Sequence, residues 1–281
     1  MSLPTDLRAV FLDVDGCLNP PDGESFSVGA QSARLSARQG AMLARIGRAV
    51  DASPVEHLVL NTGRKYADTR FIAEGLSSAK LRYLILEHGS VVYDLEQDHY
   101  PDLLDLAQHF ELHEIARKYE STEHIARVME WFATEGRHQL GERLGAPCET
   151  IEKRASLCFC VPEQLEAAQI HRELLKLVDE HPELRSELLE CHESSEYLDV
   201  LGLVDKAEGI ALLLAQLGLA PEQALVVGDG SNDRSAFELL PHGFCPANAN
   251  PELEALCRAR GGRVARRAYG EGVLELFEGL E

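Results

Sequence analysis

Short apolar runs alternate with longer amphipathic stretches in the first and last thirds of the chain. The apolar runs have the length of single strands and predict strands near 8–13, 57–61, 82–87 and 224–228. Apolar residues at helical spacing predict helices near 36–49, 65–76, 206–217 and 251–259. This alternation indicates an α/β domain in which a mostly parallel, doubly wound sheet carries helices on both faces.

The middle third of the chain follows a different order of elements. Its pattern predicts helices near 102–118, 122–135 and 163–179, a strand near 151–161, and short β-like runs near 187–192 and 197–203. We therefore expect an α+β domain, residues 88–195, inserted into the α/β domain that residues 1–87 and 196–281 form.

Two acidic residues follow the first predicted strand. Asp13 and Asp15 stand after the apolar run 9–12, and residues i and i+2 of a strand point to the same face. Neighbouring carboxylates repel each other unless a cation lies between them or one of them holds a proton. The pair thus indicates a metal site or an acid/base beside a nucleophile, although a solvated acidic turn would have the same sequence.

A second acidic cluster follows the strand predicted at 224–228. It reads Gly-Asp-Gly-Ser-Asn-Asp over residues 228–233. A calcium-binding EF-hand loop that began at Asp229 would need glycine where Arg234 stands, and one that began at Asp13 would need it at Leu18. A dinucleotide-binding loop from Gly228 would have Asp233 at its third glycine, where an acid would repel pyrophosphate. Neither alternative fits.

Two smaller signals lie between the acidic clusters. Thr62-Gly63-Arg64 ends the strand at 57–61 just before a helix, where free backbone N–H groups can hold a phosphate. A Thr-Gly turn at this place also serves as an ordinary helix cap. Lys206 begins the helical pattern of 206–217, and a lysine taken alone is most often surface.

The order of these residues resembles the haloacid dehalogenase superfamily of phosphotransferases. The family's four motifs correspond to Asp13-Val14-Asp15-Gly16, to Thr62-Gly63-Arg64, to Lys206, and to residues 228–233. Three departures stand out: Cys17 replaces a usual threonine, Gly209 comes later after the lysine than in many relatives, and the stretch from Asp15 to Thr62 is long. We expect its Gly-, Ser- and Pro-rich part, residues 20–32, to form a flap over the site.

The resemblance extends to the inserted domain. An α+β insertion at this point is similar to the cap of the type-IIB branch, which includes Cof-type and sugar-phosphate phosphatases, and it implies a Rossmann-like core with a cap that selects the substrate. In those members an acidic and basic passage precedes a cap strand, as Glu152-Lys153-Arg154 does here. Arg154 is therefore a candidate substrate ligand, with a salt-bridged surface strand as the alternative.

The resemblance also implies a role for each site residue. Asp13 is expected to attack phosphorus, and Asp15 to act as general acid and base. A Mg²⁺ ion is expected on the Asp13 carboxylate, the Asp15 backbone carbonyl and Asp229, with Asn232 and Asp233 ordering its surroundings. Lys206 is the third catalytic candidate, and Thr62, Gly63 and Arg64 are expected to bind the substrate phosphate.

The predicted function is hydrolysis of a small phosphorylated metabolite, most simply a sugar phosphate, through an aspartyl-phosphate. A phosphosugar mutase, which returns the phosphoryl group to substrate, has the same motifs. A phosphometabolite-binding protein without catalysis is an alternative of another class. A requirement for a bisphosphate activator would identify the mutase. Binding of the metabolite without turnover would identify the non-catalytic binding protein.

Composition narrows the range of partners and locations. The formal net charge of −20 disfavours nucleic acid or an anionic membrane as a partner. The seven cysteines include no C-x-x-C pair, and no signal-peptide pattern or run of eighteen apolar residues occurs. We expect reduced thiols and a cytoplasmic location, whereas the oligomeric state and the substrate's identity are not set by these features.

Overall fold

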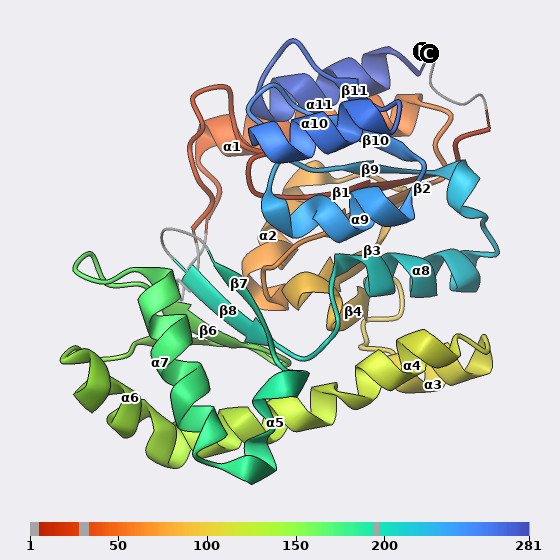
Figure 1. Ribbon diagram of the computed structural model, residues 1–281. Coiled ribbons are helices and arrows are strands. Elements are labelled where there is room, and N and C mark those ends of the chain that lie inside the picture. Colours follow the sequence, from red (N-terminus) through yellow and green to blue (C-terminus); the bar gives the residue numbers. More distant parts are fainter. Residues whose placement is uncertain (1–5, 28–33, 194–196, 281) are drawn as a thin grey trace. The chain divides into compact units, whose positions relative to one another are not determined.

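The computed structural model describes residues 6–27, 34–193 and 197–280. The chain forms two compact units, shown in Figure 1. One consists of residues 1–102 and 205–281, and the other of residues 103–204. Each unit has its own sheet.

The first unit is built on a seven-stranded sheet in the order β11-β10-β9-β1-β2-β3-β4. All neighbouring strands run parallel except β3 and β4, which are antiparallel. The strands are β1 (Ala9–Leu12), β2 (His57–Asn61), β3 (Leu81–Leu86), β4 (Val91–Asp94), β9 (Ala224–Val227), β10 (His242–Cys245) and β11 (Arg263–Val264).

Six helices accompany this sheet in the described part of the unit. They are α1 (Ala37–Ala52), α2 (Tyr66–Leu76), α8 (Lys206–Leu217), α9 (Arg234–Leu239), α10 (Pro251–Ala259) and α11 (Tyr269–Glu278). Helix α1 packs against α2 and α11, whereas α9 packs against α8 and α10, so the helices form two groups (Figure 1). The predicted doubly wound α/β fold is confirmed.

Burial explains why β1 lies at the centre of the sheet. All four of its residues are apolar and fully buried, as suits a strand covered on both faces. From β1 the chain continues to β2 on one side, and β9 pairs with β1 on the other. In a sheet of this kind, ligands bind beyond the carboxyl ends of the strands at such a reversal.

The second unit contains a four-stranded antiparallel sheet in the order β5-β6-β8-β7. Its strands are β5 (Thr150–Glu152), β6 (Leu157–Cys160), β7 (Glu190–Glu193) and β8 (Tyr197–Leu201). Its helices are α3 (Leu103–His109), α4 (His113–Glu120), α5 (Thr122–Trp131), α6 (Arg137–Leu144) and α7 (Ala167–Asp179). Phe132, Phe159, Leu174 and Leu198 belong to the apolar core between the sheet and these helices.

The units depart from the sequence predictions in a few places. The helix predicted at 102–118 is broken into α3 and α4, because Glu111 takes a left-handed backbone conformation with φ 57°. The strand predicted at 151–161 is a hairpin, in which β5 and β6 pair antiparallel. Strand β4 lies in the first unit, where it pairs with β3, and β8 lies in the second. The predicted domain boundaries had placed each of these two strands in the other domain.

Candidate active site

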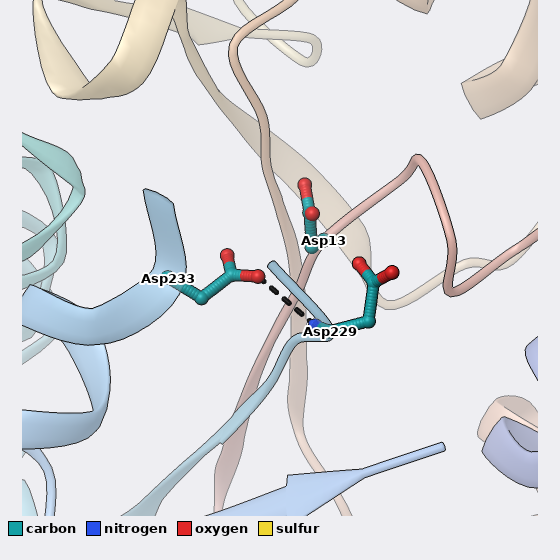
Figure 2. Close-up of side chains that lie close together, drawn as sticks. All are labelled: Asp13, Asp229 and Asp233. Carbon is teal, nitrogen blue, oxygen red and sulfur yellow. Dashed lines mark hydrogen bonds between the residues drawn. The ribbon is translucent and has the colours of Figure 1, made fainter. Parts of the chain in front are cut away.

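The carboxyl ends of β1 and β9 bring three aspartates together. Asp13 follows β1, where its backbone N–H donates to the carbonyl of Val227, the last residue of β9. Asp229 and Asp233 stand in the turn between β9 and α9. One carboxylate oxygen of each residue lies within 4.8 Å of the others, and Figure 2 shows the three side chains. Two acidic clusters far apart in the sequence thus form one site.

Lys206 joins two of these aspartates. Its side chain is fully buried, and Nζ lies 2.9 Å from Asp13 Oδ1 and 2.6 Å from Asp233 Oδ1. Asp205 caps α8 by accepting from the Ala207 N–H, which fixes the helix start and places Lys206 in its first turn. The lysine that the sequence alone could not distinguish from surface is therefore part of the site.

Asp233 also shapes the turn that carries Asp229. Its Oδ2 accepts hydrogen bonds from the backbone N–H groups of Asp229 and Gly230, each at 3.0 Å. Both oxygens of Asp233 are thus held by protein donors, Oδ1 by Lys206 and Oδ2 by the turn. This geometry makes Asp233 a support for Lys206 and for the turn that carries Asp229.

The electrostatics of the cluster show an excess of negative charge. Burial, together with the nearby Asp233 carboxylate, raises the pKa of Asp229 to about 7. Burial and Asp233 also raise the pKa of Asp13 well above its usual range, although Lys206 opposes the shift. Burial alone would lower the pKa of Lys206, but Asp13 and Asp233 outweigh it and raise that pKa. One buried ammonium therefore does not balance the three acids.

The donor set fits a hard divalent cation. Asp13 and Asp229 offer carboxylate oxygens, and Mg²⁺ is usually bound by one or two carboxylates together with substrate phosphate and water. Among the described residues this cluster consists of aspartates, whose carboxylates are hard oxygen ligands. Asn232, predicted to lie near the metal, is half-buried, and its Oδ1 approaches Gly230 in the same turn.

Asp15 and Arg64, predicted for different roles, form an ion pair. Arg64 Nε donates to one carboxylate oxygen of Asp15 and Nη2 to the other, both at 2.6 Å. Arg64 also donates to the backbone carbonyls of Phe26 and Ser27 in the predicted flap. Residues 28–32 of that flap lie outside the described residues. In this geometry both Asp15 oxygens act as acceptors.

Thr62 and Gly63 lie at the carboxyl end of β2, next to the cluster's strand β1. Thr62 is buried, and its Oγ1 accepts from the Arg64 N–H at 3.2 Å, so the hydroxyl hydrogen is not used by this bond. A side chain at position 63 would collide with the ring of His88, because its Cβ would lie 2.4 Å from both Cε1 and Nε2 of that ring. A larger residue at position 63 would therefore require the His88 ring to move.

Asn248 supports the cluster and was not predicted from the sequence. Its Nδ2 donates to the Gly16 carbonyl at 2.9 Å and to Asp229 Oδ2 at 3.3 Å. Gly16 itself has φ 73°, and a Cβ there would overlap the Asp229 carboxylate. The only sequence signal for Asn248 is its place in an Asn-Ala-Asn turn before α10, and β10, which positions that turn, was not predicted either.

Arg154 belongs to the second unit, whereas the aspartate cluster belongs to the first. It is exposed in the connection between β5 and β6. Its neighbour Lys153 is the more buried residue, with Nζ 2.5 Å from Asp199 Oδ1 on β8. The acidic and basic passage at 152–154 thus contributes Lys153 to a buried ion pair with Asp199, which was not predicted from the sequence.

Comparison with known proteins places the chain in a family. Residues 56–275 match the family model described as haloacid dehalogenase-like hydrolase. The chain belongs to this family of hydrolases, and the resemblance drawn from the four motifs is confirmed.

Among curated proteins, a 73-residue segment is 41% identical to a phosphoglycolate phosphatase of Haloarcula marismortui. That segment is 26% of this chain and spans only 30% of the length of that relative.

Solved structures match nearly the whole chain in fold. The sucrose-phosphatase of Synechocystis sp. PCC6803 is 19% identical with a TM-score of 0.63, and the match covers 97% of each chain. A sugar phosphatase of subclass IIB is 14% identical with a TM-score of 0.56, covering 96% of this chain and 98% of the other. A Thermoplasma acidophilum protein is 17% identical with a TM-score of 0.61 and 98% coverage of both. The type-IIB fold, with its α+β insertion, is thereby confirmed.

Two of the predictions drawn from composition concern the cysteines and the helices. All seven cysteines are free thiols in the structure. Within the described residues, no helix has both the length and the apolar character that a membrane span requires.

Proposed function

We propose that the protein is a Mg²⁺-dependent phosphatase that hydrolyses a small phosphorylated metabolite, a sugar phosphate in the first instance, through an aspartyl-phosphate on Asp13. The observation that carries this proposal is the buried linkage Asp13–Lys206–Asp233 with Asp229 beside it. The family is one of hydrolases, and relatives named as phosphatases share its fold or part of its sequence.

Asp13 is the proposed nucleophile. It is held at the end of a buried strand, and its Oδ1 contacts Lys206, which leaves the other carboxylate oxygen to attack phosphorus. Fixing the nucleophile in this way removes much of the entropic cost of the reaction. Lys206 then stabilises the negative charge that spreads over the phosphoryl oxygens in the transition state.

Mg²⁺, bound by Asp13 and Asp229, would neutralise the charge of the incoming phosphate dianion. This explains how a site with three acidic side chains can accept an anion. Asp233 and Asn248 hold Asp229 in place from two sides, through its backbone N–H and its Oδ2 respectively. We assign Asp233 and Asn232 to support of the metal site and not to direct coordination.

Asp15 is the proposed general acid and base. A carboxyl group can donate a proton only from an oxygen that carries one, and here both oxygens accept from Arg64. The acid step thus requires this contact to open. Opening would also release two N–H groups of Arg64, which suit the oxygens of a phosphate. We therefore assign Arg64 first to Asp15 and, once that contact has opened, to the substrate phosphate. Thr62 and the Gly63 backbone are further proposed phosphate ligands.

The proposal is tested by a screen of the purified protein against a panel of phosphorylated metabolites with Mg²⁺, in which released inorganic phosphate is measured. We expect release from a subset of sugar phosphates, and none from the Asp13→Asn variant. Phosphate transfer between two positions of the substrate, with dependence on a bisphosphate, would instead identify a mutase. Binding without any turnover would overturn the proposed activity.

A further inference from the structure

Asn61, the last residue of β2, is a buried polar residue that has no role in the mechanism proposed above. Its exposure is 2%. Its Oδ1 is buried and has no hydrogen-bond partner among the described residues. An unsatisfied buried oxygen destabilises the folded protein and calls for an explanation, and one such explanation is a role in another state of the active site.

The sheet register places Asn61 beside the nucleophile. Leu12 of β1 pairs with Leu60 of β2, so the next residues, Asp13 and Asn61, are neighbours at the ends of the two strands. Since side chains alternate along a strand, both lie on the face that Phe11 and Val59 share. On its other side Asn61 pairs with Ile85 of β3.

Helix α8 crosses this same face. A Cβ on Gly209 would lie 2.7 Å from Ile85 Cγ2, so the first turn of α8 covers the row that contains Asn61. That turn begins with Lys206, whose Nζ contacts Asp13 and Asp233. An ammonium has three N–H donors, and these two carboxylates account for two of them.

We propose that Asn61 is a positioning residue for Lys206, and that its carboxamide oxygen accepts the third N–H of the ammonium while Asp13 carries the phosphoryl group. This inference rests on the proposed function. Attack by one Asp13 oxygen forms a new O–P bond while the ester P–O bond breaks, and the alcohol leaves with a proton from Asp15. The carboxylate's electron pair forms the new bond, so the other Asp13 oxygen becomes a neutral acyl oxygen. Lys206 then loses one of its two anionic partners, and Asn61 supplies an acceptor that keeps Nζ in place.

A neutral amide suits this position better than an acid. The cluster already holds three carboxylates around one buried lysine. A fourth would further raise the pKa of Asp13 and repel the substrate phosphate. An amide oxygen, in contrast, adds an acceptor without adding charge.

The test compares two variants of similar size, Asn61→Leu and Asn61→Asp, with an aryl phosphate and Mg²⁺. Steady-state rates are measured together with the fraction of enzyme that acid quenching traps as phosphoenzyme. In Asn61→Leu we expect kcat to fall about tenfold and KM to fall with it, because only the step after phosphorylation loses a hydrogen bond to a charged group. The trapped phosphoenzyme fraction should rise. The melting temperature should stay the same or rise, since an unsatisfied polar group has been removed.

Asn61→Asp keeps the acceptor and adds a charge, so we expect the opposite pattern. Its kcat/KM should fall, and its phosphoenzyme fraction should not rise. If Asn61→Leu retains the wild-type kcat and phosphoenzyme fraction, the role of Asn61 is wrong. Equal losses of kcat and kcat/KM with a lowered melting temperature would also overturn it, since they indicate general damage. Turnover by wild-type enzyme without any label on Asp13 would overturn the proposed function itself, and this role with it.

Discussion

Each unit of the molecule contains a buried lysine in contact with aspartate, but the two arrangements differ. In the first unit Lys206 contacts both Asp13 and Asp233, and Asp229 lies in the same cluster. In the second unit Lys153, in the connection between β5 and β6, contacts Asp199 on β8 of the antiparallel sheet. In the first cluster the acids outnumber the lysine, and the pKa values of Asp13 and Asp229 are raised accordingly. Such an excess is costly for the fold and indicates a site that binds a cation.

The difference between the Lys206 and Lys153 arrangements helps to distinguish a structural ion pair from a functional one. A buried contact between a lysine and a carboxylate, such as Lys153–Asp199, can be part of the architecture alone, because the two charges compensate each other. A lysine shared between carboxylates at the end of a parallel sheet, where ligands bind, indicates chemistry. Substitutions of residues in these two groups, and of the exposed arginine next to Lys153, test this contrast.

The largest effect is expected from Asp13→Asn. An amide cannot form the acyl-phosphate, so turnover should fall by at least about 10³-fold, while far-ultraviolet circular dichroism and the melting temperature stay close to wild type. Activity above a few per cent of wild type would show that Asp13 is not the nucleophile.

Lys206→Met and Lys153→Met form a matched pair that replaces each lysine by an apolar side chain of similar length. Lys206→Met should lower kcat and kcat/KM together on every substrate, by about 2–4 kcal/mol of transition-state stabilisation. Lys153→Met should retain turnover of a small aryl phosphate and instead lower thermal stability, because it leaves Asp199 without this partner. Similar losses of activity in both variants would remove the distinction between the two lysines.

Asp15→Asn should have an effect that depends on the leaving group. An aryl phosphate departs without a proton, whereas an alkyl phosphate needs one, so the loss of kcat should be at least about tenfold greater on the alkyl ester. Rates on the two esters are measured side by side for wild type and variant. An equal loss on both esters would argue against a proton-transfer role for Asp15.

The metal-free protein should lose stability as the pH rises. A carboxyl group whose pKa is higher in the folded than in the unfolded chain contributes stability that is complete below its unfolded pKa of about 3.9. That stability is lost as the pH rises through the folded value, which for Asp229 is about 7. We therefore expect the melting temperature to fall between about pH 4 and pH 7 in the presence of a chelator.

Added Mg²⁺ should reverse this fall, with a larger stabilisation at pH 8 than at pH 5, because protonation of Asp229 competes with the metal. Asp229→Asn should weaken both the pH dependence and the response to Mg²⁺. The exposed Glu222→Gln variant is the control for removal of one surface carboxylate. A response to Mg²⁺ that is the same at both pH values, or unchanged in Asp229→Asn, would contradict the assigned metal ligand.

The smallest effect is expected from Arg154→Ala. If Arg154 holds the non-reacting part of the substrate, its removal should lower kcat/KM on the physiological metabolite and spare a small aryl phosphate. The measurement is the ratio of the two kcat/KM values in wild type and variant. An unchanged ratio would assign Arg154 to the surface.

The sequence predicted the core of the fold because its signals there are local. Strand β1 is apolar at every position and is followed by Asp13, and the strand β9 that precedes Asp229 is equally apolar. By contrast β10 carries His242 and Gly243, and β11 has two residues, so neither resembles a buried strand in sequence. Asn248, which depends on β10 for its position, was missed for the same reason.

Contacts between residues far apart in the sequence could not be predicted either. The Asp15–Arg64 ion pair joins positions 49 residues apart, and Lys153 meets Asp199 46 residues away. The spacing of apolar residues along the chain does not predict such contacts, because they depend on the order of the strands in the sheet. In the sequence Asn61 is only the polar end of an apolar run, and it is the register with β1 that places it beside Asp13.

The central claim is that Asp13 becomes phosphorylated during turnover. It is tested most directly by quenching wild-type enzyme in acid during steady-state hydrolysis of an aryl phosphate with Mg²⁺, followed by mass spectrometry of the peptide that contains Asp13. We predict that this peptide carries one phosphoryl group, that the label disappears on treatment with hydroxylamine, and that neither chelated enzyme nor Asp13→Asn is labelled. Steady phosphate release with an unmodified Asp13 peptide, or labelling at another residue, would contradict the account.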